Sequence, residues 1–290
     1  MHSSDFAYRT PATLAEAISL LQSGDDVKLL AGGQSLIPLL KLRFAQVGTL
    51  VDLSKLTHLR AITEGGDSIA IGAMTTYFQV IDSPVVQRRC PLLIQAIKQV
   101  GDPQVRARGT VGGSLAHADP AGDLPAAALA LEAEISAQGP NGTRSIAARD
   151  FFTDMLTTAL QPSEVLTWVR FHTTDQPHTG TAYVKHRHPA SGYAVVGAAA
   201  VVMLNDDGTC RAARVGITGA GTHAVRAAGV EQALAGRPLD DATLGAASAS
   251  AADGIELLGD TYASKDYRAH LARVLTKRAL GQAAQAARRR

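Results

Sequence analysis

Two short stretches combine paired glycines with hydroxyl side chains, and they carry the clearest chemical signal in the sequence. They read AGGQSL over residues 31–36 and TVGGSL over residues 110–115. Paired glycines leave consecutive backbone N–H groups uncovered, and at a helix start these groups and the helix dipole attract an anion. Ser35 and Ser114 each add a hydroxyl donor. One such stretch is usually a turn, but two similar ones predict two clamps for the two phosphates of a pyrophosphate.

The bound group is predicted to be held rather than cleaved. The sequence contains no GxxxxGK[ST] motif, so a kinase or a nucleotide hydrolase is disfavoured and a dinucleotide cofactor is favoured. A third pattern, GAGTHA over residues 219–224, has the glycine spacing of a Rossmann fingerprint, with Asp240 about twenty residues further on. That acidic residue belongs to a segment typical of a loop and a helix cap. We therefore interpret the pattern as a strand-to-helix turn.

The segments around the first glycine pair predict a small strand–helix–strand unit. Thr13 and Glu16 have the spacing of a capping box, at the start of a helix with apolar residues on one face. Apolar runs over residues 27–31 and 49–54 predict buried strands. A short helix is expected from about Leu36, so the glycines follow a strand directly.

The rest of the chain predicts hairpins and helices, and the predicted fold class is α+β. Gly65-Gly66 and Asn141-Gly142 predict hairpin turns, and the polar segment 173–180 predicts a domain boundary. Three strands are expected after this boundary. The predicted helix starts are near Asp123, His223, Asp240 and Lys265. The predicted domains are residues 1–175, in two parts of about 1–56 and 57–175, and a sheet-plus-helix domain at 176–290.

Bulk composition disfavours several classes of function. The 290 residues are 46% hydrophobic and carry a net charge of +2, so neither nucleic acid nor an acidic membrane surface is predicted as a partner. No apolar run is long enough to span a bilayer and the first residues do not form a signal peptide, so we expect a cytoplasmic protein. Cys90 and Cys210 are too few for a zinc or iron–sulfur site. His186 and His188 share one side of a strand without a third ligand, so no metal site is predicted.

Three longer motifs together carry a family resemblance. They read AGGQSLIPLLKLR, DPQVRARGTVGGSLAHADPAGDLP and YVKHRHPASGYAVVG, in this order along the chain. They resemble the medium FAD-binding subunit of molybdenum hydroxylases, the carbon monoxide dehydrogenase and xanthine dehydrogenase family. The resemblance covers nearly the whole chain. It implies a two-part FAD-binding domain, made of a small strand–helix–strand unit and a larger mixed unit, followed by a small antiparallel sheet with helices.

The resemblance also implies which residues contact FAD. The first stretch and the second stretch would each form an FAD loop, while Asp123 would reach a polar part of the cofactor or simply cap a helix. Leu166 and Lys185 would line the flavin side, and Tyr193 would lie near the isoalloxazine ring. His117 and Asp119 fit an FAD loop better than acid–base catalysis. The implied cofactor-binding residues are Ala31, Gly32, Gly33, Gln34, Ser35, Leu36, Val100, Thr110, Gly112, Gly113, Ser114, Asp123, Leu166, Lys185 and Tyr193.

The implied function is electron transfer, with no catalytic residue in this chain. A large molybdopterin-binding partner would oxidise the substrate, and a small [2Fe–2S] partner would pass the electrons to FAD here, in a dimer of heterotrimers. The flavin would then reduce a quinone, NAD⁺ or oxygen. Gln34 stands where the carbon monoxide dehydrogenases of this family have His. The substrate therefore stays open between carbon monoxide, an aldehyde and an N-heterocycle.

Two alternatives remain at this point. A stand-alone FAD oxidoreductase of the vanillyl-alcohol oxidase-like class would need a substrate domain rich in aromatic and acid–base groups. Aromatic residues make up only 4% of this chain, and its last part is rich in alanine. A non-enzymatic nucleotide-binding module would be colourless when isolated.

Overall fold

A small parallel sheet begins the chain. The computed structural model describes residues 3–24 and 26–290, and its first unit contains strands β1 (Ala7–Arg9), β2 (Val27–Leu30) and β3 (Thr49–Asp52) in the order β1-β3-β2. The Thr13 hydroxyl accepts the Glu16 N–H at the start of helix α1 (Leu14–Leu21), as the predicted capping box requires, but the Glu16 carboxylate accepts the Ala12 N–H instead of the Thr13 N–H. Helix α2 (Leu36–Lys41) follows the first glycine pair. Short 3₁₀ turns at Leu53–Lys55 and Thr57–Arg60 lead to the second unit.

The second unit is an antiparallel sheet with a layer of short helices. Its strand order is β4-β5-β10-β6-β7, which places the late strand β10 at the centre between two hairpins. Both predicted hairpin turns are present. The strands are β4 (Ile62–Gly65), β5 (Ser68–Gly72), β6 (Glu134–Gly139), β7 (Gly142–Ala147) and β10 (Val165–His172), with a separate small hairpin of β8 (Phe152–Asp154) and β9 (Thr157–Thr158). The helices are α3 (Tyr77–Asp82), α4 (Pro84–Arg89), α5 (Pro91–Ile97), α6 (Pro103–Arg108), α7 (Val111–His117), α8 (Asp123–Ala130) and α9 (Ala148–Phe151).

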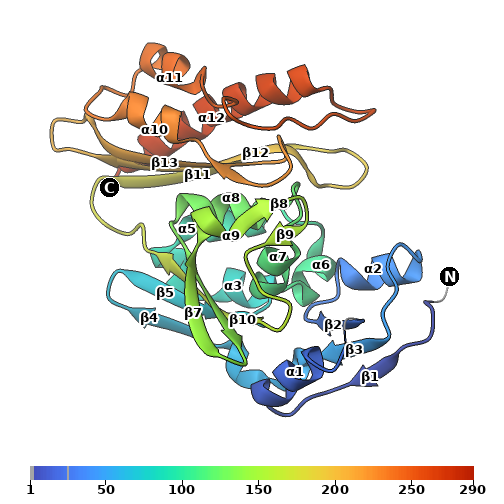
Figure 1. The fold of residues 1–290 in the computed structure, drawn as a ribbon. Coiled ribbons are helices and arrows are strands. Elements are labelled where there is room, and N and C mark those ends of the chain that lie inside the picture. Colours follow the sequence, from blue (N-terminus) through green and yellow to red (C-terminus); the bar gives the residue numbers. More distant parts are fainter. Residues whose placement is uncertain (1–2, 25) are drawn as a thin grey trace.

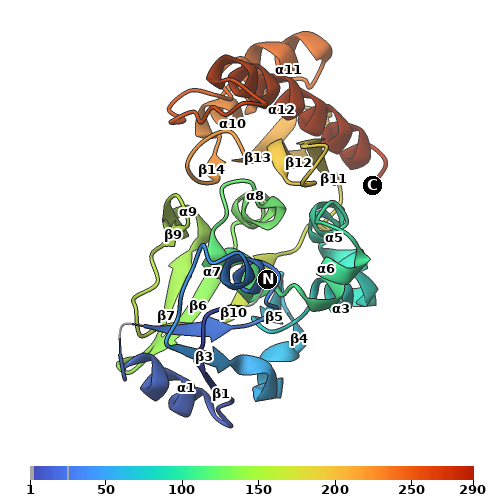
Figure 2. The same cartoon turned by 90° about the vertical axis from the view of Figure 1, so that its right-hand side faces the viewer.

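The third unit is a second antiparallel sheet that lies over the helices of the second unit (Figure 1, top; Figure 2). Its strands pair in the order β11-β12-β13-β14. They are β11 (Thr179–Arg187), β12 (Ala194–Leu204), β13 (Cys210–Thr218) and β14 (Val225–Arg226), and the helices are α10 (Ala228–Leu234), α11 (Asp241–Ser248) and α12 (Lys265–Ala287). These units match the predicted α+β class.

Helix α8 packs against two parts of the molecule at once. All eight of its residues are buried, and the views in Figures 1 and 2 show it beneath the third unit's sheet. A side chain at Gly216 of β13 would place its Cβ 2.1 Å from the Ala126 carbonyl oxygen, so the glycine permits this close packing. The predicted division at residue 175 falls between β10 and β11. The division remains a proposal, because α8 lies before residue 175 in the sequence but packs against β13, which lies after it.

Two predicted elements differ from the structure. The second glycine stretch is not a loop, since Gly112 and Gly113 lie in the first turn of α7. The helix expected from about His223 begins at Ala228 instead, because residues 225–226 first pair with β13 as strand β14.

Close packing of β11 against α12 gives a stability prediction. A Cβ at Gly180 would lie 2.0 Å from the Ala283 carbonyl oxygen, so Gly180→Ala should push α12 away and lower the free energy of unfolding by about 2 kcal/mol. Gly281→Ala is the matched control on α12, because its added Cβ meets Leu244 at an ordinary 3.7 Å. It should be neutral or stabilising, since alanine favours a helix. Chemical denaturation of both variants tests this, and equal stabilities would contradict it.

Candidate functional site

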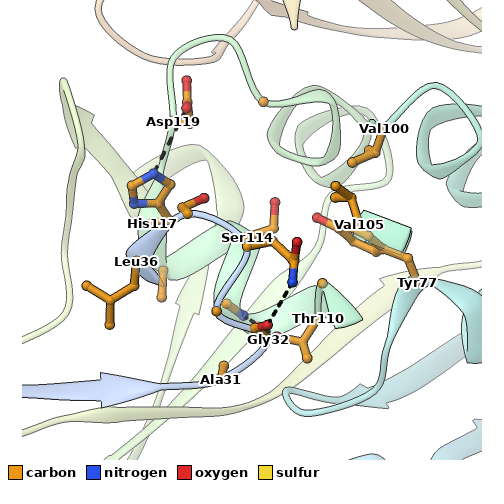
Figure 3. A pocket seen from close by; sticks show the side chains of 18 of the residues that line it. Ala31, Gly32, Leu36, Tyr77, Val100, Val105, Thr110, Ser114, His117 and Asp119 are labelled. Atoms are coloured by element: carbon orange, nitrogen blue, oxygen red, sulfur yellow. Dashed lines mark hydrogen bonds and ion pairs between the residues drawn. The ribbon is translucent and has the colours of Figure 1, made fainter. Parts of the chain in front are cut away.

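A cavity of about 640 Å³ lies where the three units meet, within the size range of small-molecule and cofactor sites (Figure 3). The first unit supplies the loop after β2, the second supplies helices α6 and α7 and the start of α8, and the third supplies the loop before β12. Every predicted binding residue except Lys185 lines this cavity. The lining thus includes Ala31, Gly32, Gly33, Gln34, Ser35, Leu36, Val100, Thr110, Gly112, Gly113, Ser114, Asp123, Leu166 and Tyr193.

The first glycine stretch presents unpaired donors to the cavity. Gly33 has φ +75°, a left-handed conformation that glycine adopts without strain. Within the described part of the chain, the backbone N–H groups of residues 32–35 have no hydrogen-bond acceptor. Ser35 precedes α2, yet its hydroxyl makes no capping bond. Several free donors facing a cavity at a helix start suit an anionic group such as a phosphate.

The second stretch differs, because the protein already uses its N–H groups. The N–H groups of Val111 and Gly112 donate to the carbonyl oxygens of Thr75 and Ala73. Those of Gly113 and Ser114 donate to the hydroxyl and the carbonyl oxygen of Thr110. The inference of two equivalent backbone clamps is therefore wrong. This stretch offers the cavity side chains such as Ser114 rather than backbone donors.

Close backbone packing explains why several positions in the two stretches require glycine. A Cβ at Gly32 would lie 2.3 Å from the Arg108 carbonyl oxygen, just before the second stretch. A Cβ at Gly113 would lie 3.3 Å from that of Ala31, and one at Gly112 would lie 2.4 Å from that of Ala73. Here the backbone must approach other protein segments, whether or not a ligand is bound. Branched substitutions at these glycines would consequently disturb the fold as well as the site.

A buried carboxylate at the start of α8 lines the cavity. Asp123 is 5% exposed and accepts hydrogen bonds from the Tyr183 hydroxyl at 2.5 Å and from Lys185 Nζ at 2.8 Å. Gly122, not Asp123, is the N-cap residue. Burial raises the pKa of Asp123 and lowers the pKa of Lys185, while their mutual attraction opposes both shifts. The pair thus joins the cavity wall to β11 of the third unit.

Lys185 lies behind the cavity wall rather than on it. Its side chain is 1% exposed, and Nζ donates both to Asp123 and to the Gln99 carbonyl oxygen at 3.1 Å. The structure therefore supports a role for Lys185 in holding Asp123. A direct contact of Lys185 with the cofactor remains a prediction.

The predicted flavin-side residues lie on different walls. Leu166 belongs to β10 and is buried, and Val100 follows α5 near the position of Val105 in α6 (Figure 3). Tyr193 is 43% exposed at the cavity mouth. Burial and the nearby carboxylate of Asp119 raise its pKa. His117 Nε2 lies 4.0 Å from an Asp119 carboxylate oxygen, and both residues also line the cavity.

Sequence reasoning missed part of the lining. Tyr77 and Leu156 both line the cavity, although they lie far from the glycine motifs in sequence. A capping box at Thr76 and Gln79 marks the start of α3, but it does not reveal that Tyr77 faces the site. Leu156 lies in the β8–β9 turn with φ +52°, which a sequence pattern does not predict for leucine.

Metal-ligand groups and membrane-spanning helices are two further features that bear on the possible chemistry. Among residues 3–24 and 26–290, no group of three or more His, Cys, Asp or Glu side chains is arranged to hold a metal ion. No helix in that part of the chain is both long and apolar enough to cross a membrane.

Comparison with known proteins gives matches along nearly the whole chain. Residues 4–172 match the family model "FAD binding domain in molybdopterin dehydrogenase", and residues 181–283 match "CO dehydrogenase flavoprotein C-terminal domain". The carbon monoxide dehydrogenase medium chain of Hydrogenophaga pseudoflava is 40% identical over 96% of both chains. Subunit alpha of the 6-hydroxypseudooxynicotine dehydrogenase complex of Paenarthrobacter nicotinovorans is 35% identical over 98% of this chain and 96% of that one. A solved structure of the Hydrogenophaga pseudoflava carbon monoxide dehydrogenase superposes with a TM-score of 0.94, at 40% identity over 98% of both chains.

The buried acid–lysine pair generates a second prediction. Lys185→Met leaves the Asp123 carboxylate buried without its cation, so the free energy of unfolding should fall by about 3 kcal/mol. Adding Asp123→Asn should recover part of this loss, because the amide carries no charge and still accepts from Tyr183. The control Lys277→Met breaks an ion pair with Asp241, which is 91% exposed, and should cost less than about 1 kcal/mol. Urea denaturation measures these three variants together with Asp123→Asn alone, and losses of the two single variants that simply add in the double variant would refute the coupling.

Proposed function

Because this chain belongs to the family of medium FAD-binding subunits of molybdenum hydroxylases, we propose that it transfers electrons from a partner's iron–sulfur clusters to an acceptor outside the complex. The family match confirms the predicted family, the predicted cofactor FAD and the assignment as an oxidoreductase subunit. The direction of electron flow, the acceptor and the identity of the partners are parts of the proposal.

The cavity is the observation that carries this proposal, and its residues suit FAD. The free N–H groups of residues 32–35 and the Ser35 hydroxyl would bind the pyrophosphate. Val165 and Leu166 form apolar lining against which a planar ring system would pack. When bound, FAD supplies the redox chemistry, and the protein supplies orientation and hydrogen bonds. Asp123 would accept a hydrogen bond from a polar group of the cofactor, since Tyr183 and Lys185 hold its carboxylate in place.

An exposed apolar rim beside the cavity supports a docking place for a partner. Leu42 and Phe44 follow α2 and are 47% and 78% exposed, while Leu156 of the β8–β9 turn is 53% exposed. Their neighbours Leu39 and Ala45, and Leu156 itself, line the cavity. We assign this rim to the small [2Fe–2S] partner, because electron transfer requires a cluster close to the flavin and exposed apolar patches favour protein contacts.

The complete assembly is proposed as a dimer of heterotrimers with a large molybdopterin-binding subunit. Relatives at similar identity are named for carbon monoxide and for 6-hydroxypseudooxynicotine, so likeness alone does not select a substrate. Carbon monoxide, an aldehyde and an N-heterocycle remain the proposed classes. The cytoplasmic location stays a prediction.

Cofactor content and activity of the single chain test the proposed function. The purified chain should release FAD, and no FMN, on mild denaturation. The cavity offers donors for a pyrophosphate, which FMN lacks, and we expect the flavin to be bound without a covalent bond to the protein. It should oxidise no hydroxylase substrate until the large and small partners are added, since the described residues lack a cluster or metal site. Substrate turnover by the iron- and molybdenum-free chain would favour a stand-alone oxidoreductase. A colourless chain that takes up no flavin would favour a nucleotide-binding module.

The rim gives a separate prediction about assembly. Phe44→Glu should weaken binding of the [2Fe–2S] partner by at least about ten-fold, because it places a charge in an apolar contact. FAD content should stay unchanged, since Phe44 does not line the cavity. Phe78→Glu, at a phenylalanine on α3 that is 57% exposed outside the rim, is the matched control. Titration of the FAD-loaded chain with the partner measures both, and equal affinities in the two variants would count against this docking place.

A further inference from the structure

The loop that brings Tyr193 to the cavity is short and forms a tight turn. Residues 188–193 connect β11 to β12, and we call residues 189–193, which follow His188, the Tyr193 loop. Ser191, Gly192 and Tyr193 all line the cavity, so one side of the loop forms part of its mouth. Gly192 has φ +75°, which allows the tight return of the chain. The position of the Tyr193 ring therefore depends on how firmly this loop is held.

His188 makes four hydrogen bonds to this loop. Its ring Nδ1 accepts the N–H groups of Ala190 and Ser191, both at 3.3 Å. Its backbone N–H donates to the Tyr193 carbonyl oxygen at 2.8 Å, and its carbonyl oxygen accepts the Gly192 N–H at 2.9 Å. Because both ring contacts come from N–H donors, Nδ1 is unprotonated in this arrangement.

A second segment supports the His188 ring from outside. The ring packs against Tyr262 with a centroid distance of 4.5 Å. Tyr262 lies in a turn in which the Asp260 carboxylate accepts the N–H groups of Tyr262 and Ala263. Asp260 also pairs with the buried guanidinium of Arg268. The ring is thus held between the Tyr193 loop and a structured turn of the third unit.

The same arginine holds the start of the strand that follows the loop. Arg268 Nη1 donates to the Val195 carbonyl oxygen at 2.6 Å and to that of Gly219 at 2.7 Å. Val195 lies two residues beyond Tyr193. The Arg268–Asp260 pair therefore holds the strand after the loop by a hydrogen bond and reaches the His188 ring through the packing of Tyr262, while His188 Nδ1 holds the middle of the loop.

We propose that His188 is a positioning residue that fixes Tyr193 over the cavity and so controls how readily an external electron acceptor reaches the bound flavin. This inference rests on the proposed function, in which such an acceptor exists. His188 acts through Tyr193 and does not line the cavity. A metal-binding role alongside His186 does not compete with this, because the His186 ring packs instead on Tyr267 at 6.1 Å and no third ligand accompanies the pair within the described residues.

The experiment uses the full-length FAD-loaded chain and compares two substitutions. His188→Ala removes the Nδ1 acceptor, whereas His188→Asn keeps an acceptor, because Asn side chains bond the backbone N–H groups two and three residues on. The flavin is reduced with dithionite and reoxidised by benzoquinone in a stopped-flow instrument. His188→Ala should change the reoxidation rate about five-fold, and His188→Asn should stay within about two-fold of the unsubstituted chain.

A flavin-independent readout measures the loop itself. Trypsin can cleave after Arg187 once the adjacent loop opens, so the rate of cleavage there should rise in His188→Ala and not in His188→Asn, in the presence or absence of FAD. Tyr262→Ala, which removes the outer support without altering His188, should change both readouts in the same direction. Tyr262→Phe keeps the ring and should leave both unchanged.

A double-variant comparison decides whether His188 acts through Tyr193. In a Tyr193→Ala background, His188→Ala should have no further effect on reoxidation. A further change of similar size there, or equal effects of His188→Ala and His188→Asn, would overturn the inference while leaving the proposed function intact. If the reoxidation rate of Tyr193→Ala itself is unchanged at full FAD occupancy, the acceptor does not reach the flavin past Tyr193. That result would refute the proposed role of His188.

Discussion

The buried carboxylate of Asp123 is the interaction on which the arrangement of the site depends. It lies at the start of α8, a helix whose residues are all buried between the second and third units. Tyr183 and Lys185 reach it from β11, so the third unit supplies both partners of an acid that faces the cavity. A buried charge without such partners would lower the free energy of unfolding. The need to pair this carboxylate therefore fixes the position of α8 relative to β11. The cavity therefore has its shape only when the third unit is in place.

Further hydrogen bonds connect the same two parts around the loop before α8. The Thr218 hydroxyl donates to the carbonyl oxygens of Pro120 and Gly122, and the Gly219 N–H also donates to Pro120. The Ala194 N–H donates to the Ala121 carbonyl oxygen. The ends of β12 and β13 thus hold the segment that carries Asp119 and Asp123 to the cavity. The third unit acts as a support for the cofactor site, and it adds the Tyr193 loop at the mouth.

The two glycine stretches show how similar motifs take different roles. The first follows a strand, and within the described residues the N–H groups of residues 32–35 have no acceptor, which is the arrangement that suits a phosphate. The second begins a helix whose first N–H groups are bonded to Ala73, Thr75 and Thr110. Its glycines allow α7 to approach the segment around Ala73 and the first stretch. One stretch therefore offers donors to a ligand, and the other mainly brings the walls of the cavity together.

The sequence alone determined the family, the cofactor and 14 of the 33 residues that line the cavity, because long motifs of fixed order are specific and local signals such as the Thr13 cap act over a few residues. It also indicated the α+β class, since the periodicity of apolar residues is a local property. Only the tertiary structure decided which glycine N–H groups are free, that Lys185 lies behind Asp123, and that Tyr77 and Leu156 face the site. These features depend on contacts between segments far apart in the chain. A hydrogen-bond donor or a buried charge takes its role from the partner that folding brings to it, and a sequence motif does not contain that partner.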